Sequence, residues 1–359
     1  MAEDKVLTFG VFVTDRCNRG CKHCAFKSTD KGRKYLQPEQ IRKLVKEAEE
    51  LGLKIVGSIS GKGEPLMHRD LVRIAEAFVG LEICREIVLI TSGFLEKDEH
   101  EKSLFQEFVS RFARNRLCVN FSFNMYASSF PERLTESLRV LFDNTDYSCS
   151  RIRVVCDCEN FFETADKWMD LMTSLGTRLG MKWDEVLLDI SGDPSFEVVK
   201  GELLSQSYSS EKEIWMEGIS LLVPSFHELK SKKRGRHCLC VDTGMVSRKG
   251  RAKNFSNSCF FPTADYRCAL VLGKSNVLSL YMDPEGNVFP SCDCVLGGLQ
   301  IGTWETPLRE LLSRKCVIRE NFLRHVLLDA DPRWNTEYQC EACLSLARKI
   351  FSFVDKLLE

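Results

Sequence analysis

Three closely spaced cysteines near the start of the chain constrain its possible folds more than any other feature. Cys17, Cys21 and Cys24 lie within eight residues, directly after the apolar run at residues 11–13, which predicts a loop at the end of a β-strand. A structural zinc site needs four ligands, commonly two Cys-x-x-Cys pairs, whereas this loop offers three thiolates. A four-iron cluster held by three thiolates keeps one iron open for a small molecule. The loop therefore predicts a metal centre, with iron–sulfur favoured over zinc.

Charge and hydropathy exclude several classes of protein. The net charge of −1, from 50 basic and 51 acidic residues, gives no electrostatic reason to expect binding to nucleic acid or to a membrane surface. The first residues lack the apolar region of a signal peptide, and no apolar run approaches the roughly 20 residues of a spanning helix. We expect a cytoplasmic protein. In that compartment the 17 cysteines indicate metal binding or catalysis rather than disulfides.

Short apolar segments alternate with amphipathic ones from residue 6 to about residue 190, which predicts repeated βα units. Pro38 at a first helical position and Gly52 after the last turn mark one of the helices. The Val, Ile and Leu content of the apolar segments suits parallel strands buried on both faces. Such units build either an open doubly wound sheet or a barrel, and periodicity alone does not decide between them. The six expected strands lie at residues 6–13, 54–60, 86–91, 118–124, 151–156 and 185–190.

The Cys-x-x-x-Cys-x-x-Cys loop resembles that of the radical S-adenosylmethionine (radical SAM) superfamily. The resemblance implies an α/β fold in which residues 1–190 form a partial (β/α)6 barrel, with the active site at the C-terminal ends of the strands. It also implies that Cys17, Cys21 and Cys24 bind a [4Fe-4S] cluster whose open iron chelates S-adenosylmethionine. Reductive cleavage of that cofactor would give methionine and a 5′-deoxyadenosyl radical, which abstracts hydrogen from the substrate.

The residues that follow the expected strands also resemble the family's cofactor site. Gly61-Lys62-Gly63-Glu64-Pro65 is similar to its Gly-Gly-Glu-Pro motif, which holds the amino group of S-adenosylmethionine, although Lys62 departs from it. An ordinary strand-to-helix turn is the alternative. Arg153 either pairs with the methionine carboxylate or points outward. The resemblance implies cofactor contacts by Gly61, Gly63, Glu64, Ser92, Ser122 and Arg153, with His23 near the adenine.

The second half of the chain is rich in cysteine. The Asp-Pro-Glu-Gly-Asn stretch at 283–287 predicts a hairpin turn. After a weakly patterned connecting segment at 191–236, residues 237–359 resemble the SPASM extension or its shorter form, twitch. That resemblance implies a small cysteine-rich β-hairpin/α domain that holds one auxiliary [4Fe-4S] cluster through Cys268, Cys292, Cys340 and Cys343. Zinc is the alternative metal; Cys259 and Cys294 are alternative ligands, and Cys238, Cys240 and Cys316 could hold a further cluster.

The expected function is therefore that of a radical SAM enzyme. By analogy with SPASM enzymes, its substrate is a ribosomally synthesised peptide that undergoes post-translational modification. A small-molecule dehydrogenase and a zinc-binding, non-catalytic interaction protein are the alternatives. An external electron donor such as flavodoxin or ferredoxin is an expected partner. No residue is identified as a catalytic acid or base.

Overall fold

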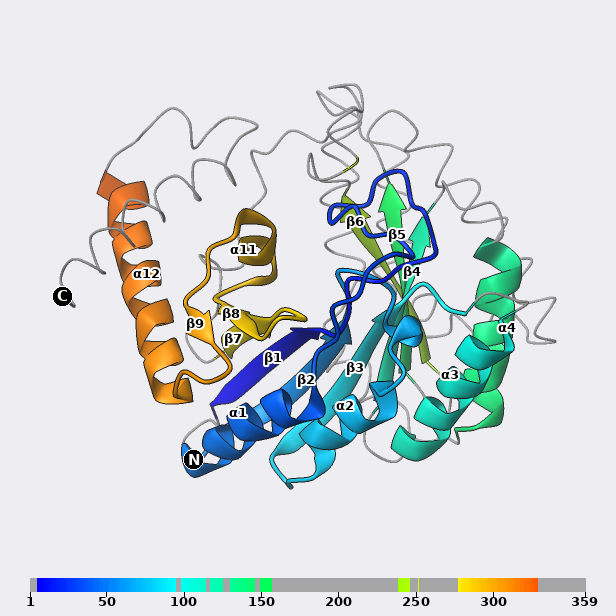
Figure 1. Ribbon diagram of the computed structural model, residues 1–359, viewed down its shortest axis with the longest axis horizontal. Helices are drawn as coiled ribbons and strands as arrows, with labels where there is room; N and C mark the ends of the chain where they lie inside the picture. Colours follow the sequence, from blue (N-terminus) through cyan, green and yellow to red (C-terminus); the bar gives the residue numbers. More distant parts are fainter. Residues whose placement is uncertain are drawn as a thin grey trace, which may run out of the picture. The chain divides into compact units, whose positions relative to one another are not determined.

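The computed structural model describes residues 5–94, 98–113, 117–124, 130–145, 149–156, 238–245, 251 and 277–328 (Figure 1). The chain divides into two compact units. The first contains residues 1–20, 24–87 and 262–359, and the second contains residues 21–23 and 88–261. In the part of the chain described, no helix combines the length and the apolar composition needed to cross a membrane.

The first unit is built on a sheet in which β1 is a central strand. β1 (Val6–Phe12) pairs in parallel with β2 (Lys54–Ser60) on one side and with β7 (Val277–Met282) on the other. Antiparallel pairing then adds β8 (Asn287–Phe289) and β9 (Gly302–Thr303). A strand from the second half of the chain thus lies directly beside the first strand.

The β1–β7 pair also explains a glycine in β1. A Cβ atom at Gly10 would overlap the ring of Tyr281, which lies at the same register position of β7. Gly10 therefore makes room for an aromatic side chain from the neighbouring strand.

Helices with strongly apolar faces cover this sheet. α1 begins at Pro38 as its sequence predicts, and Gly52 follows its end in a left-handed conformation with φ 68°. α1 buries Ile41, Leu44 and Val45, and each such side chain contributes about 1.5–3 kcal/mol when removed from water. The described residues of this unit contain the helical segments α1 (Pro38–Glu50), η1 (Pro65–Met67), α2 (Leu71–Val79), α11 (Cys292–Gly297) and α12 (Leu308–Leu328).

The second unit repeats the βα pattern. It starts within β3 (Cys84–Thr91) and continues through α3 (Glu99–Phe112), β4 (Leu117–Asn124), α4 (Phe130–Asp143), β5 (Cys149–Cys156) and β6 (Cys238–Met245). β5 lies between β4 and β6 and is parallel to both. Phe105 of α3 contacts the rings of Phe94 and Phe121, which fixes α3 over the sheet.

These elements confirm an α/β fold with parallel strands, and five of the six expected strands are present. The sixth, at 185–190, lies outside the described residues. β6 at Cys238–Met245 was not expected as a strand. The predicted hairpin at 283–287 is confirmed, because β7 and β8 flank it as an antiparallel pair. Closure into a six-unit partial barrel and the domain boundaries at 190 and 236 stay predictions.

Candidate functional site

The loop that carries the three cysteines runs from the end of β1 to the start of α1, and we call residues 13–37 the cysteine loop. Its two limbs are bound to each other by isolated bridges between Thr14 and Tyr35 and between Arg16 and Thr29. The amide of Cys17 donates to the Thr29 carbonyl at 2.8 Å. Cys17, Cys21 and Cys24 are all free cysteines of intermediate exposure. The loop is therefore ordered by its own backbone contacts, and its three cysteines are partly exposed.

The glycine-rich turn after β2 packs directly against this loop. The amide of Gly63 donates to the Thr14 carbonyl and that of Glu64 to the Arg16 carbonyl, both at 2.8 Å. A Cβ atom at Gly63 would overlap the backbone of Arg16. Glycine at this position thus permits a close backbone approach, and the turn fixes the limb of the loop that leads into Cys17.

Glu64 is a buried carboxylate whose charge is balanced by the cysteine loop. Its Oε2 atom lies 3.7 Å from Nε of Arg19, and the two side chains are 4% and 3% exposed. Its Oε1 atom accepts from the amide of Leu66 at 3.3 Å, so that Glu64 also caps η1. A carboxylate held in this way is pre-oriented, and its predicted contact with the cofactor amino group stays a prediction.

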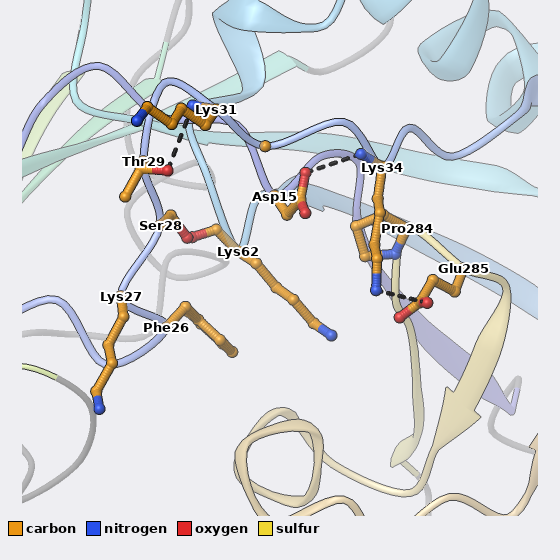
Figure 2. Close-up of a pocket in the computed structure, with 11 residues that line it drawn as sticks. Asp15, Phe26, Lys27, Ser28, Thr29, Lys31, Lys34, Lys62, Pro284 and Glu285 are labelled. Atoms are coloured by element: carbon orange, nitrogen blue, oxygen red, sulfur yellow. Dashed lines mark hydrogen bonds and ion pairs between the residues drawn. The ribbon is translucent and has the colours of Figure 1, made fainter.

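Lys62 joins the same turn to the β7–β8 hairpin. Its Nζ atom donates to Oδ2 of Asp283 at 3.0 Å, and its carbonyl accepts from Oγ of Ser28. Lys62 also lines a cavity of about 410 Å³ beside the cysteine loop (Figure 2). The cavity is lined by Asp15, Phe26, Lys27, Ser28, Thr29, Lys31, Gly32, Lys34, Lys62, Pro284 and Glu285. Its lining is therefore predominantly polar and rich in lysine.

The predicted cofactor residues of the second unit are arranged on strands and strand ends. Ser92 follows β3, and the next residue, Gly93, has φ 76° and donates its amide to Oγ1 of Thr91. Ser122 of β4 and Arg153 of β5 occupy one register level. Asp242 of β6 lies at the same level as Arg153. Sequence reasoning missed Asp242, because residues 238–245 were not expected to form a strand.

His23 of the cysteine loop and Arg251, which contacts this loop at Cys21, also belong to the second unit. Burial lowers the pKa of His23 to about 4, so its ring is neutral at pH 7. The Nη1 atom of Arg251 donates to the Cys21 carbonyl at 2.9 Å. An uncharged ring is compatible with the predicted position of His23 against an adenine.

The structure describes only some of the cysteines expected to bind an auxiliary cluster. Cys292 begins α11 and packs at the edge of an apolar cluster with Phe12 and Phe289. Cys294 is buried in that cluster, and its sulfur accepts from Oγ of Ser291 at 3.1 Å. Of the other candidates, Cys316 is exposed on α12, Cys238 and Cys240 lie in β6, and Cys259, Cys268, Cys340 and Cys343 lie outside the described residues. The auxiliary cluster stays a prediction.

No metal site is preformed within the described ranges, since no three His, Cys, Asp or Glu side chains there are grouped to hold an ion. The donor chemistry of the cysteine loop nevertheless fits an iron–sulfur cluster, because three accessible thiols lie within eight residues of one loop.

A family model matches the part of the chain that carries most of these residues. Residues 11–139 match the model of the Radical SAM superfamily, a stretch that includes the cysteine loop, the turn after β2, Ser92 and Ser122. Over these residues the chain is similar to members of that superfamily.

Individual relatives match about a quarter to a third of the chain. A probable GTP 3′,8-cyclase of Methanopyrus kandleri is 36% identical over 94 residues, which is 26% of this chain and 29% of the relative. The GTP 3′,8-cyclase of Aquifex aeolicus is 31% identical over 128 residues, or 32% and 39% of the two chains. The chain thus matches well under half the length of these relatives.

Among solved structures, Streptococcus suis SuiB bound to precursor peptide SuiA is 14% identical, with a TM-score of 0.47 over 86% of this chain and 65% of that one. A likeness of this degree assigns neither a fold nor a substrate.

Proposed function

We propose that this chain is a radical SAM enzyme, which reductively cleaves S-adenosylmethionine and abstracts hydrogen from its substrate. The observation that carries the proposal is the direct packing of the Gly61–Glu64 turn on the cysteine loop, through the Gly63 and Glu64 amides. Two motifs separated by about forty residues of sequence are thereby held together by backbone hydrogen bonds, an arrangement that fits a shared ligand.

The chain's own residues would bind and orient the cofactor. Cys17, Cys21 and Cys24 are the thiolates for a [4Fe-4S] cluster, which when reduced would supply the electron that breaks a sulfur–carbon bond of S-adenosylmethionine. Glu64, already oriented by Arg19 and the Leu66 amide, would accept a hydrogen bond from the cofactor's amino group. Ser92, Ser122 and Arg153 stay candidates for its ribose and carboxylate. The chain thus contributes orientation, while the cofactor supplies the chemistry.

For the substrate, we propose a ribosomally synthesised peptide, and an external flavodoxin or ferredoxin as electron donor. The peptide rests on the likeness of residues 237–359 to the SPASM and twitch extensions. The β7–β8 hairpin that delivers Cys292 to the start of α11 supports such an extension. A mass change in a candidate peptide, dependent on S-adenosylmethionine and reductant, would support this substrate. Turnover of a small alcohol instead would favour a dehydrogenase.

The test of the enzyme class is metal content and cofactor cleavage. Anaerobically purified protein is expected to carry iron and acid-labile sulfide for two four-iron clusters, and to release 5′-deoxyadenosine with dithionite and S-adenosylmethionine. The triple variant Cys17→Ala/Cys21→Ala/Cys24→Ala should lose one cluster and all cleavage, because its substitutions remove three thiolate ligands. Cys84→Ala, which lies in β3, is the matched control and should keep both. Zinc in place of iron, or no 5′-deoxyadenosine from iron-loaded protein, would contradict the proposal.

A further inference from the structure

Lys62 is the one position at which the glycine-rich turn departs from the family motif, and the structure gives this lysine a specific contact. Its Nζ atom lies 3.0 Å from Oδ2 of Asp283, a residue 221 positions away in sequence. The lysine side chain is 22% exposed and the aspartate 3%. The ion pair is therefore largely shielded from water.

Asp283 is held rigidly by its own hairpin. Its Oδ1 atom accepts from the amides of Glu285 and Asn287, both at 3.0 Å. Its Oδ2 atom also accepts from Nδ2 of Asn287 at 3.3 Å. We call residues 283–287 the hairpin tip. Since the tip fixes both carboxylate oxygens, Asp283 offers Lys62 a fixed anchor rather than a mobile surface charge.

The side chain of Lys62 contacts the hairpin tip, whereas the backbone around Lys62 is hydrogen-bonded to the cysteine loop. Its carbonyl accepts from Ser28, and the next two amides donate to Thr14 and Arg16. Lys62 thus lies where three segments meet, namely the hairpin tip, the cysteine loop and the turn that carries Glu64. Movement of the lysine backbone would be transmitted directly to Gly63 and Glu64.

A second lysine, Lys34 of the cysteine loop, also contacts the hairpin tip and provides a contrast. Nζ of Lys34 lies 2.6 Å from Oε1 of Glu285, but these side chains are 52% and 45% exposed (Figure 2). Exposed pairs contribute little, whereas removing one member of a shielded pair leaves the other charge without compensation. The Lys34 pair can therefore be broken with little effect, and the Lys62 pair cannot.

We infer that Lys62 is a positioning residue, whose ion pair with Asp283 lets the hairpin tip hold the Gly61–Glu64 turn in its cofactor-binding conformation. This inference rests on the proposed binding of S-adenosylmethionine at that turn. It assigns to the hairpin tip a role in cofactor affinity and explains how the turn accommodates a lysine that departs from the family motif.

The test compares Lys62→Met, Asp283→Asn and their double variant with Lys34→Met as matched control. All are measured as cluster-loaded protein under anaerobic conditions, by hydrogen exchange of the Gly63 and Glu64 amides and by calorimetric titration with S-adenosylmethionine. Each single variant should exchange these amides faster and bind about tenfold more weakly, the loss typical of one charge-assisted contact. The double variant should be no worse than either single one, because the two side chains act as a pair. Lys62→Arg, which keeps the charge, should restore part of the affinity.

The outcomes separate this inference from the proposed function. Unchanged amide exchange and affinity in both single variants, or additive losses in the double variant, would overturn the positioning role. The same is true if Lys34→Met weakens binding as much as Lys62→Met, or if melting temperatures fall while affinity stays constant. If the wild type binds no S-adenosylmethionine, the proposed function fails and the cofactor role of Lys62 fails with it. Hydrogen exchange would in that case still report whether the ion pair orders the turn.

Discussion

Gly63→Ala tests whether the close approach between the turn and the cysteine loop holds the site together. The added Cβ would overlap backbone atoms of Arg16, which cannot move aside as a flexible side chain can. Overpacking of this kind costs about 1–3 kcal/mol. Separation of the two segments would also strain the hydrogen bonds from the Gly63 and Glu64 amides, each worth about 0.5–1.5 kcal/mol. We therefore expect a loss of about 2–4 kcal/mol in the free energy of unfolding.

Thermal unfolding and cofactor titration measure this effect. A loss of that size lowers the melting temperature by roughly 5–15 °C, taking about 2–4 °C per kcal/mol for a domain of some 150–250 residues. Gly80→Ala is the matched control, because Gly80 follows α2 in a right-handed helical conformation and its Cβ would meet the nearest atom at 3.4 Å. That variant should be neutral or slightly stabilising. Equal melting temperatures and equal affinity for S-adenosylmethionine in the two variants would refute the argument.

Two other predictions concern titratable side chains of the first unit. Glu64→Gln should weaken binding of S-adenosylmethionine about tenfold or more in calorimetric titration, because a charged acceptor is lost. It should also destabilise the fold, because Arg19 keeps a buried charge. Unaltered binding would limit the role of Glu64 to capping η1. Burial raises the pKa of the Cys84 thiol to about 11, so at pH 8 roughly one molecule in a thousand carries the reactive thiolate. Alkylation of Cys84, measured by mass spectrometry, should therefore be slow, and its rate should rise about tenfold per pH unit. Fast alkylation of Cys84 at pH 8, comparable with that of the exposed Cys316, would contradict this reading.

The sequence predicts most of the local structure because local signals determine it. The apolar runs that became β1 and β2 and the proline that begins α1 act over a few residues. β6 was missed because Cys238–Met245 mixes cysteine, aspartate and glycine with few β-branched residues, so its cysteines suggested a metal site instead. Its place beside β5 is a tertiary effect that propensity does not encode.

The pairing of β1 with β7 is also a tertiary effect, since the two strands are separated by more than half of the chain. The hairpin turn at 283–287 could be predicted from its residues, but the pairing of its first strand, β7, with β1 could not. The same applies to Lys62, because the sequence shows its departure from the family motif, while its contact with Asp283 exists only in the folded chain.

The position of the hairpin changes how the two halves of the chain relate to the proposed function. β7 gives β1 a second parallel neighbour, so β1 is not an exposed edge strand. The hairpin tip reaches the turn and the cysteine loop through Asp283 and Glu285, and the cluster of Phe12, Phe289 and Cys294 packs the end of β1 against α11. Residues after 276 therefore complete the packing and the ion pairs around motifs that lie before residue 65. The proposed cofactor site depends on both halves, whether or not the second half also binds a cluster of its own.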